Sequence, residues 1–178
     1  MSIGKNASTR SEAFVQMVIE RLNDKRPDTA LRAALRKAEN PATTKQSWEY
    51  LTRWCDIEDD RKWKPFALVG SAIAWEKPQK NGEVGIGQAI ARCYASENKF
   101  DGCEKDGAKI KLRRLLACDT IEEACIILRP IIRLINSKNI ALNYVELLDN
   151  LLSTNNYFND HIKPQWAKDF FYKPEEEE

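Results

Sequence analysis

The chain has 178 residues, of which 43% are hydrophobic and 31% are charged, so it can bury one real core and does not have the composition of a disordered chain. The formal net charge is +1, but the last four residues are all glutamate, so the rest of the chain carries a net charge of +5. For a moderately basic protein of this kind, the placement of the cations matters more than their total.

The five cysteines form an odd set without a CxxC pair, and the only histidine is His161. This pattern supports neither a zinc module nor a disulfide framework, and it favours a reducing compartment. No apolar signal segment lies near the N-terminus, and no segment approaches about eighteen consecutive apolar residues, the length that a membrane span needs. We therefore expect a cytoplasmic protein that needs no cofactor and has no membrane partner.

Apolar residues recur at spacings of three and four through most of the N-terminal half, which predicts helices rather than strands. Ser11 and Asp28 are the predicted N-caps of the first two helices, and Pro41 ends the second. Two further helices and a loop are expected at residues 48–54, 63–74 and 76–83.

In the C-terminal half, the segment from Thr120 to Glu123 has the pattern of a capping box and predicts the start of a helix that continues to Ile135. Pro130 lies inside this helix and should kink it near Ile126 or divide it in two. A further helix is expected at residues 145–152, and the aromatic segment 163–172 should dock as a last short helix.

These elements predict an all-α protein that forms a compact multi-helix bundle, either as one domain or as two closely packed helical lobes. The expected boundaries are a flexible N-terminus at residues 1–10, the helical domain at 11–173 and a solvated acidic tail at 174–178.

The segment from Lys109 to Leu116 carries four cations and no acidic residue. On a helix its three leucines share one face, so the cations project from the opposite side. A face that serves only solubility usually mixes charges of both signs. This helix therefore favours an anionic partner.

An ordered set of short segments resembles the CasB family, the small subunit of the type I-E CRISPR surveillance complex Cascade, over most of the chain. The segments are Ala30-Leu31-Arg32, Gly85-Ile86-Gly87-Gln88-Ala89, Arg113-Arg114-Leu115-Leu116, Leu128-Arg129 and Trp166-Ala167-Lys168-Asp169-Phe170-Phe171.

The resemblance implies an all-α protein without enzymatic activity, present in two copies in the complex. Its partners would be the guide RNA, the target and displaced DNA strands, the backbone and large subunits of the complex, and a second copy of itself. It also implies that Gly85 and Gly87 set a turn before a helix that Gln88 and Arg92 begin and flank. Pro130 departs from the pattern that the family would lead us to expect after Arg129.

The cations that we predict to contact nucleic acid come from the basic helix, from the resemblance and from two earlier basic groups. They are Arg32, Arg36, Lys37, Arg53, Lys62, Lys64, Arg92, Lys109, Lys111, Arg113, Arg114, Arg129 and Arg133. Trp54 and Trp63 lie beside three of these cations and could stack on unpaired bases, although core packing is the favoured interpretation of tryptophans at helical spacing.

The sequence is less consistent with three kinds of enzymatic site. A nucleophile pair would need His161 and a cysteine, but the cysteines have the sequence environment of buried thiols. The acidic run from Asp56 to Asp60 could attract a metal ion, yet a loop or helix cap is favoured. The glycines at Gly85 and Gly87 lack the GxxxxGK[ST] pattern of a phosphate-binding loop.

Two non-enzymatic alternatives also stay open. A free-standing helix-turn-helix regulator would concentrate base-reading side chains on one helix, whereas these cations are spread over several. A helical protein-interaction scaffold would lack salt-dependent binding to nucleic acid.

Overall fold

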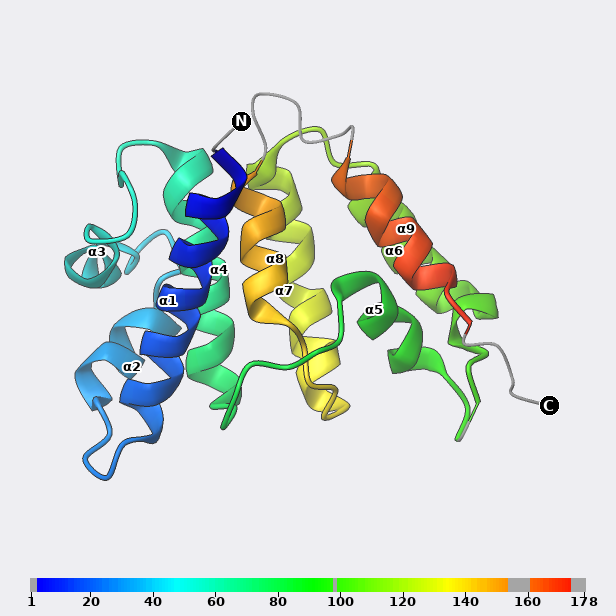
Figure 1. The fold of residues 1–178 in the computed structure, drawn as a ribbon, viewed down its shortest axis with the longest axis horizontal. Helices are drawn as coiled ribbons and strands as arrows, with labels where there is room; N and C mark the ends of the chain where they lie inside the picture. The colour runs from blue at the N-terminus through cyan, green and yellow to red at the C-terminus, as the bar shows by residue number, and fades with distance from the viewer. Residues whose placement is uncertain (1–2, 98, 154–160, 174–178) are drawn as a thin grey trace. The chain divides into compact units, whose positions relative to one another are not determined.

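The computed structural model describes residues 3–97, 99–153 and 161–173, and over these residues the protein is all-α, as predicted. The only β-type pairing in these ranges is an isolated bridge between Val84 and Leu142. The helices (Figure 1) are α1 (Ile3–Asn23), α2 (Thr29–Arg36), α3 (Lys45–Leu51), α4 (Asp60–Glu76), α5 (Ile86–Tyr94), the short 3-10 helix η1 (Gly102–Glu104), α6 (Asp106–Leu116), α7 (Ile121–Ser137), α8 (Tyr144–Leu152) and α9 (Ile162–Phe171).

The chain forms two compact units, and each unit contains two separate segments of the sequence. The first unit comprises residues 1–82 and 144–155, and the second comprises residues 83–143 and 156–178. Helices α1 to α4 and α8 therefore belong to the first unit, and α5 to α7 and α9 belong to the second.

The core of the first unit is built around α4, in which every residue from Pro65 to Ala74 is buried. A helix that is apolar on all sides must be surrounded by other helices, and α4 indeed contacts α1, α2, α3 and α8. The rings of Phe14 and Phe66 meet edge to face at 4.9 Å, and Trp54 packs on Phe14 at 5.4 Å. Trp54 is thus half-buried against the core, as the favoured interpretation predicted.

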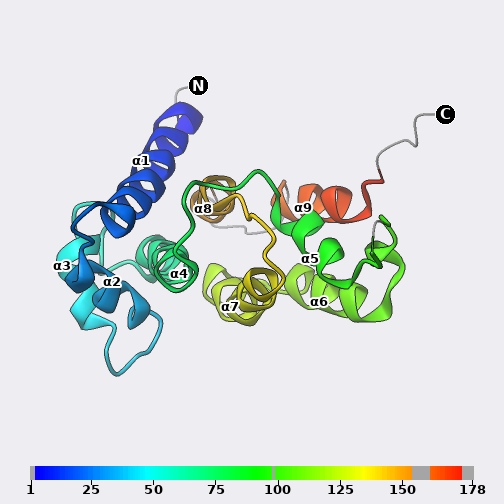
Figure 2. The same cartoon turned by 90° about the horizontal axis from the view of Figure 1, so that it is seen from below.

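In the second unit α5 is the central helix, because it contacts α6, α7, α9 and η1 (Figure 2). Its closest neighbour is α9, which buries Trp166 and Phe170. The aromatic segment at residues 163–172 therefore does dock as a short helix, as predicted. Gly87 makes the close approach possible, since a Cβ atom there would lie 2.1 Å from the backbone oxygen of Trp166.

Within each unit, hydrogen bonds hold the segments where the chain passes to the other unit. In the first unit the side-chain oxygen of Asn81 accepts from the backbone N–H of Tyr144 at 2.8 Å and from that of Val145 at 3.4 Å, which satisfies donors at the start of α8. In the second unit Val84 donates to Ala141 at 3.1 Å and accepts from Asn143 at 2.8 Å.

Two of the predicted helix starts are correct. The Asp28 carboxylate accepts from the backbone N–H of Leu31, and the Thr120 hydroxyl accepts from that of Glu123 at 3.2 Å. The returning bond of the capping box differs by one residue, because the Glu123 carboxylate accepts from the N–H of Asp119 at 2.9 Å.

The cap predicted at Ser11 is wrong, because α1 begins at Ile3 and Ser11 lies inside it, fully buried. Residues 5–10 contain neither glycine nor proline, so nothing in the backbone ends the helix before Ser11. Pro130 does not divide α7, which continues from Ile121 to Ser137.

The predicted domain boundaries at residues 11 and 173 and the flexibility of residues 1–10 stay predictions. The acidic tail at 174–178 lies outside the described residues.

The packing of α5 on α9 leads to a first prediction. Gly87→Ala should lower the free energy of unfolding by about 2 kcal/mol, because the added Cβ atom must displace a backbone carbonyl group rather than a flexible side chain. Urea denaturation followed by circular dichroism measures this change.

Gly107→Ala is the matched control, since its Cβ atom would meet the ring of Tyr94 at 2.6 Å. A ring can move, and alanine favours the helix by about 1 kcal/mol over glycine, so this variant should change stability by less than about 1 kcal/mol. An unfolding free energy for Gly87→Ala equal to or above that of the wild type would contradict the close approach.

Candidate nucleic-acid interface

Helix α6 separates leucines from cations as the sequence predicts. Leu112 and Leu115 are buried, whereas Arg113 and Arg114 are exposed. In the described part of the chain neither arginine forms an ion pair. Ile110 shares the exposed side and is 52% exposed, which the spacing of the leucines did not reveal.

The two arginines lie in the last turn of α6, where the free carbonyl groups favour positive charge. That effect alone explains a cation at the helix end. It does not explain Lys109 and Lys111, which lie further back, are half-exposed and form no ion pair with any described residue. The helix therefore carries more positive charge than its own stability requires.

The second unit holds three more of the predicted cations, on helices that contact each other or α6. Arg92 is exposed on α5, and α7 carries the half-buried Arg129 and the exposed Arg133. Helix α6 contacts both α5 and α7. The structure thus brings together the helices that carry seven of the predicted residues: Arg92, Lys109, Lys111, Arg113, Arg114, Arg129 and Arg133.

In the first unit α2 carries two of the predicted cations and its C-cap residue is a third, and each has a defined contact. The side-chain Nε of Arg32 donates to the backbone oxygen of Ala74 at 3.1 Å, and Lys37 donates to Gln46 at 3.1 Å. The guanidinium carbon of Arg36 lies 3.5 Å from the ring centroid of Trp75, a close cation–π contact. Sequence reasoning missed Trp75 because it considered only the tryptophans next to basic residues in the chain.

The cations near the start of α4 are less available. The Nζ of Lys62 lies 3.5 Å from the Asp59 carboxylate, and the Nζ of Lys64 lies 2.7 Å from that of Asp60. The hydrogen bond from Arg61 lowers the pKa of Asp59, and the bond from Lys64 lowers that of Asp60. The remaining candidate of this region, Arg53, is exposed just beyond α3.

The acidic run before α4 acts as a helix cap, the favoured interpretation of the sequence. The Asp59 carboxylate accepts from the backbone N–H of Arg61, and Asp60 accepts from the indole N–H of Trp63 at 2.9 Å. In the described ranges no group of three or more histidine, cysteine or acidic side chains could hold a metal ion.

The turn at Gly85 and Gly87 has a packing role. Gly85 is the N-cap of α5, and Gly87 lies directly against the backbone oxygen of Trp166. The need for glycine at position 87 is therefore explained by this close approach, without a phosphate-binding role.

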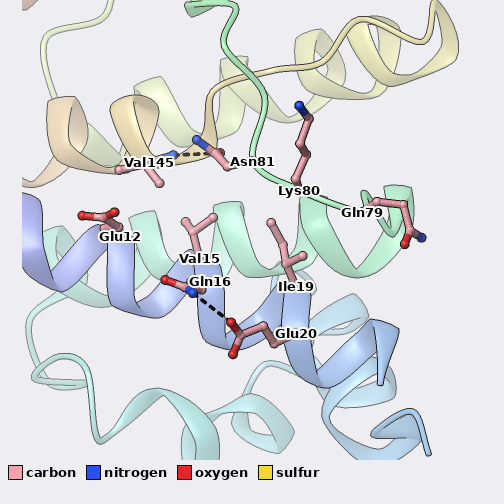
Figure 3. Close-up of a pocket in the computed structure, with 9 residues that line it drawn as sticks. All are labelled: Glu12, Val15, Gln16, Ile19, Glu20, Gln79, Lys80, Asn81 and Val145. Atoms are coloured by element: carbon pink, nitrogen blue, oxygen red, sulfur yellow. Dashed lines mark hydrogen bonds between the residues drawn. The ribbon is translucent and has the colours of Figure 1, made fainter. Parts of the chain in front are cut away.

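A hollow of about 330 Å³ lies beside α1 in the first unit (Figure 3). Val15 and Ile19 point from α1 toward the segment that carries Lys80. The carboxylates of Glu12 and Glu20 also line the hollow, so acidic groups outnumber its single lysine. This surface does not suit a polyanion.

None of the thiols is placed to act as a nucleophile. All five cysteines are buried, and burial raises the pKa of Cys55 and that of Cys93 to about 11. The only histidine, His161, is exposed at the start of α9. A catalytic thiol instead needs a lowered pKa and access to its substrate.

The sequence pattern of the family described as CRISPR-associated protein Cse2 matches residues 31–171. The chain belongs to this family. The CasB assignment made from the sequence is therefore confirmed. Among curated proteins no sequence matches the chain.

Several solved structures have the same fold as this Cse2-family chain. A chain of a structure described as a CRISPR RNA-guided surveillance complex is 14% identical, with a TM-score of 0.72 and 92% of each chain covered. CasB from Thermus thermophilus is 19% identical, with a TM-score of 0.66, and the match covers 90% of this chain and 97% of that one. M. ruber CasB is 22% identical, with a TM-score of 0.62 and coverages of 91% and 92%.

No helix in the described part of the chain is both long enough and apolar enough to cross a membrane.

The buried thiols lead to a second prediction. Alkylation of the folded protein by iodoacetamide should be slow, and the rate should still rise above pH 9.0 because burial keeps the pKa of Cys55 and that of Cys93 near 11. Mass spectrometry of the labelled peptides measures the rate at each cysteine. Guanidinium-unfolded protein is the control and should be labelled fully, whereas rapid labelling of one native cysteine near neutral pH would reopen the nucleophile hypothesis.

Proposed function

We propose that the protein is a non-catalytic nucleic-acid-binding subunit of an RNA-guided CRISPR effector complex of the Cascade type. Its basic faces would stabilise the paired guide RNA and target DNA and the displaced strand. The proposed partners are the guide RNA, both DNA strands, the backbone and large subunits of the complex and a second copy of this chain. The observation that carries the proposal is the exposed face of α6, whose cations form no ion pair with a described residue, in a chain of the Cse2 family.

The chemistry of an opened target supports this role. An RNA–DNA hybrid is about as stable as the DNA duplex that it replaces, so modest contacts to the backbone can shift the balance. The guide reads the sequence by base pairing, and a subunit that holds the strands needs only cations that contact phosphates. Arg113 and Arg114 meet this need, since both are exposed and neither is neutralised by a described carboxylate.

The candidate residues differ in how well they support the proposal. Arg92 and Arg133 are exposed on helices that contact α6 or each other, so they are the next candidates after the pair on α6. Lys62 and Lys64 are the weakest, because contact with a phosphate would have to replace their bonds to Asp59 and Asp60.

The structural roles of the thiols and carboxylates support the non-catalytic part of the proposal. The thiols are buried, and burial raises the pKa of Cys55 and that of Cys93. The Asp59 carboxylate caps α4, and the Asp60 carboxylate binds Lys64. Nuclease assays with and without magnesium test this part, and turnover that a point substitution in this chain abolishes would contradict it.

A third prediction concerns the pair on α6. In an assembled complex, the double variant Arg113→Glu and Arg114→Glu should weaken target binding while the helix stays folded, because Leu112 and Leu115 still bury its inner face. Fewer counterions would be released, so the log–log slope of affinity against salt should flatten by about 0.9 per lost contact on duplex DNA and about 0.7 on a single strand. Target affinity measured at several salt concentrations gives both quantities.

The matched control is Lys25→Glu with Arg26→Glu, which makes the same change in net charge at two exposed adjacent residues between α1 and α2. The control should affect affinity less and leave the slope near the wild-type value. Circular dichroism and size exclusion check folding and assembly. Equal effects of the two double variants would indicate a response to net charge alone, and an unchanged affinity in the α6 variant would refute the role of these arginines.

A further inference from the structure

Trp75 differs from the other four tryptophans, all of which lie in the described ranges. It is 51% exposed at the C-terminal end of α4, whereas Trp48, Trp54 and Trp63 are half-buried and Trp166 is buried. The exposed part of this large aromatic ring is available to a partner outside the fold, and such a partner would bury more apolar area there.

A cation covers one face of the Trp75 ring. The Arg36 guanidinium lies over the ring at 3.5 Å, while half of the residue surface stays open. The two other cation–ring contacts of the described residues, at Trp48 and Trp63, have their lysine nitrogens 6.0 Å from the ring centroids. Trp75 and Arg36 thus form the closest such pair and the one with the most accessible ring.

The position of Arg36 is fixed by packing between α2 and α4, which contact each other. Its Nε atom is buried and has no hydrogen-bond partner among the described residues. One turn earlier on α2, Arg32 is fixed by its bond to the oxygen of Ala74, the residue before Trp75. The ring and both guanidinium groups are therefore held in place before any ligand binds, which lowers the entropic cost of binding.

The cations beside Trp75 are Arg32 and Arg36, and one carboxylate is also near, because Glu39 accepts a hydrogen bond at 3.0 Å from Ser71, one turn before Trp75 on α4. In the described part of the chain Arg32, Arg36 and Lys37 form no ion pair. The Arg36 guanidinium therefore stacks on the Trp75 ring without a bond to any described carboxylate. The nearest acidic side chain along α4 is Glu76, whose carboxylate accepts a hydrogen bond from the Tyr144 hydroxyl. An open aromatic ring beside fixed guanidinium groups that form no ion pair with a described carboxylate matches the chemistry of a single strand, in which bases stack and phosphates carry the charge.

We propose that Trp75 and Arg36 form a stacking site for an unpaired nucleobase of single-stranded nucleic acid. The base lies on the open part of the indole ring, and Arg32, Arg36 and Lys37 contact the adjacent phosphates. This inference rests on the proposed function, because it assigns an unpaired strand of the opened target or of the guide to a surface of the first unit.

The test uses the full chain and fluorescent oligomers of equal length: oligothymidylate, oligouridylate and an abasic DNA strand with the same phosphate spacing. Trp75→Ala should weaken binding of oligothymidylate by about tenfold and leave binding of the abasic strand unchanged, because only stacking is lost. Trp75→Phe should retain most of the affinity, since it keeps an aromatic ring. Arg36→Ala should weaken binding of all three oligomers.

Oligouridylate separates the two possible sources of the base. A larger effect of Trp75→Ala on the DNA strand would assign the site to the displaced or target strand, and a larger effect on RNA would assign it to the guide. Either result supports the stacking site. Ile126→Ala is the control, because it truncates an apolar side chain that is 62% exposed and has no ring; it should leave all affinities unchanged.

The outcomes separate this inference from the proposed function. If the wild type binds the strands in a salt-dependent manner but Trp75→Ala binds as well as the wild type, or loses equal affinity for abasic and base-containing strands, the stacking site is refuted alone. If the wild type binds none of the oligomers, the proposed function and the stacking site are both refuted for this chain. Thermal unfolding of each variant confirms that the fold is intact.

Discussion

The approach of α5 to α9 at Gly87 is the contact on which the second unit depends. With no side chain at this position, the helix backbone lies directly against the carbonyl group of Trp166, and the aromatic side chains of α9 reach the core. Helix α5 also contacts α6 and α7, so its position determines where the cations of both helices are presented. The lack of a side chain at Gly87 thus determines the geometry of a basic surface, although glycine itself carries no charge.

The bonding partners of the cations distinguish surfaces that are similar in amino-acid composition. At the start of α4 the lysines bind the carboxylate of the N-cap Asp59 and that of Asp60, the first residue of the helix. On α6 the arginines have no such partner among the residues that the structure describes. On α2 the guanidinium groups bind a carbonyl oxygen and an aromatic face, neither of which removes their positive charge. A phosphate can therefore bind on α2 or α6 without displacing an acidic side chain.

Local chemistry made most of the fold predictable. The caps at Asp28 and Thr120, the leucine face of α6 and the docking of the aromatic C-terminal segment follow from spacing and side-chain type, and the structure confirms them. Ser11 was misassigned because a serine that can cap a helix can equally lie within one, and the apolar neighbours that bury it come from distant segments. Trp75 could not be identified because its partner Arg36 is remote in the chain, so no local pattern joins them. Whether the predicted cations contact nucleic acid is a property of a complex, which spacing along one chain cannot determine.

The double passage of the chain between the units has a consequence during synthesis on the ribosome. Helix α8 covers α1 and α4, yet it is made only after α5, α6 and α7. The N-terminal segment must wait with its apolar surface uncovered while the middle of the second unit emerges, although domains usually fold in the order in which they are made. Pairing between such distant segments slows folding, because a long loop must close before the contact forms. In this topology the first helices to leave the ribosome are among the last to complete their core.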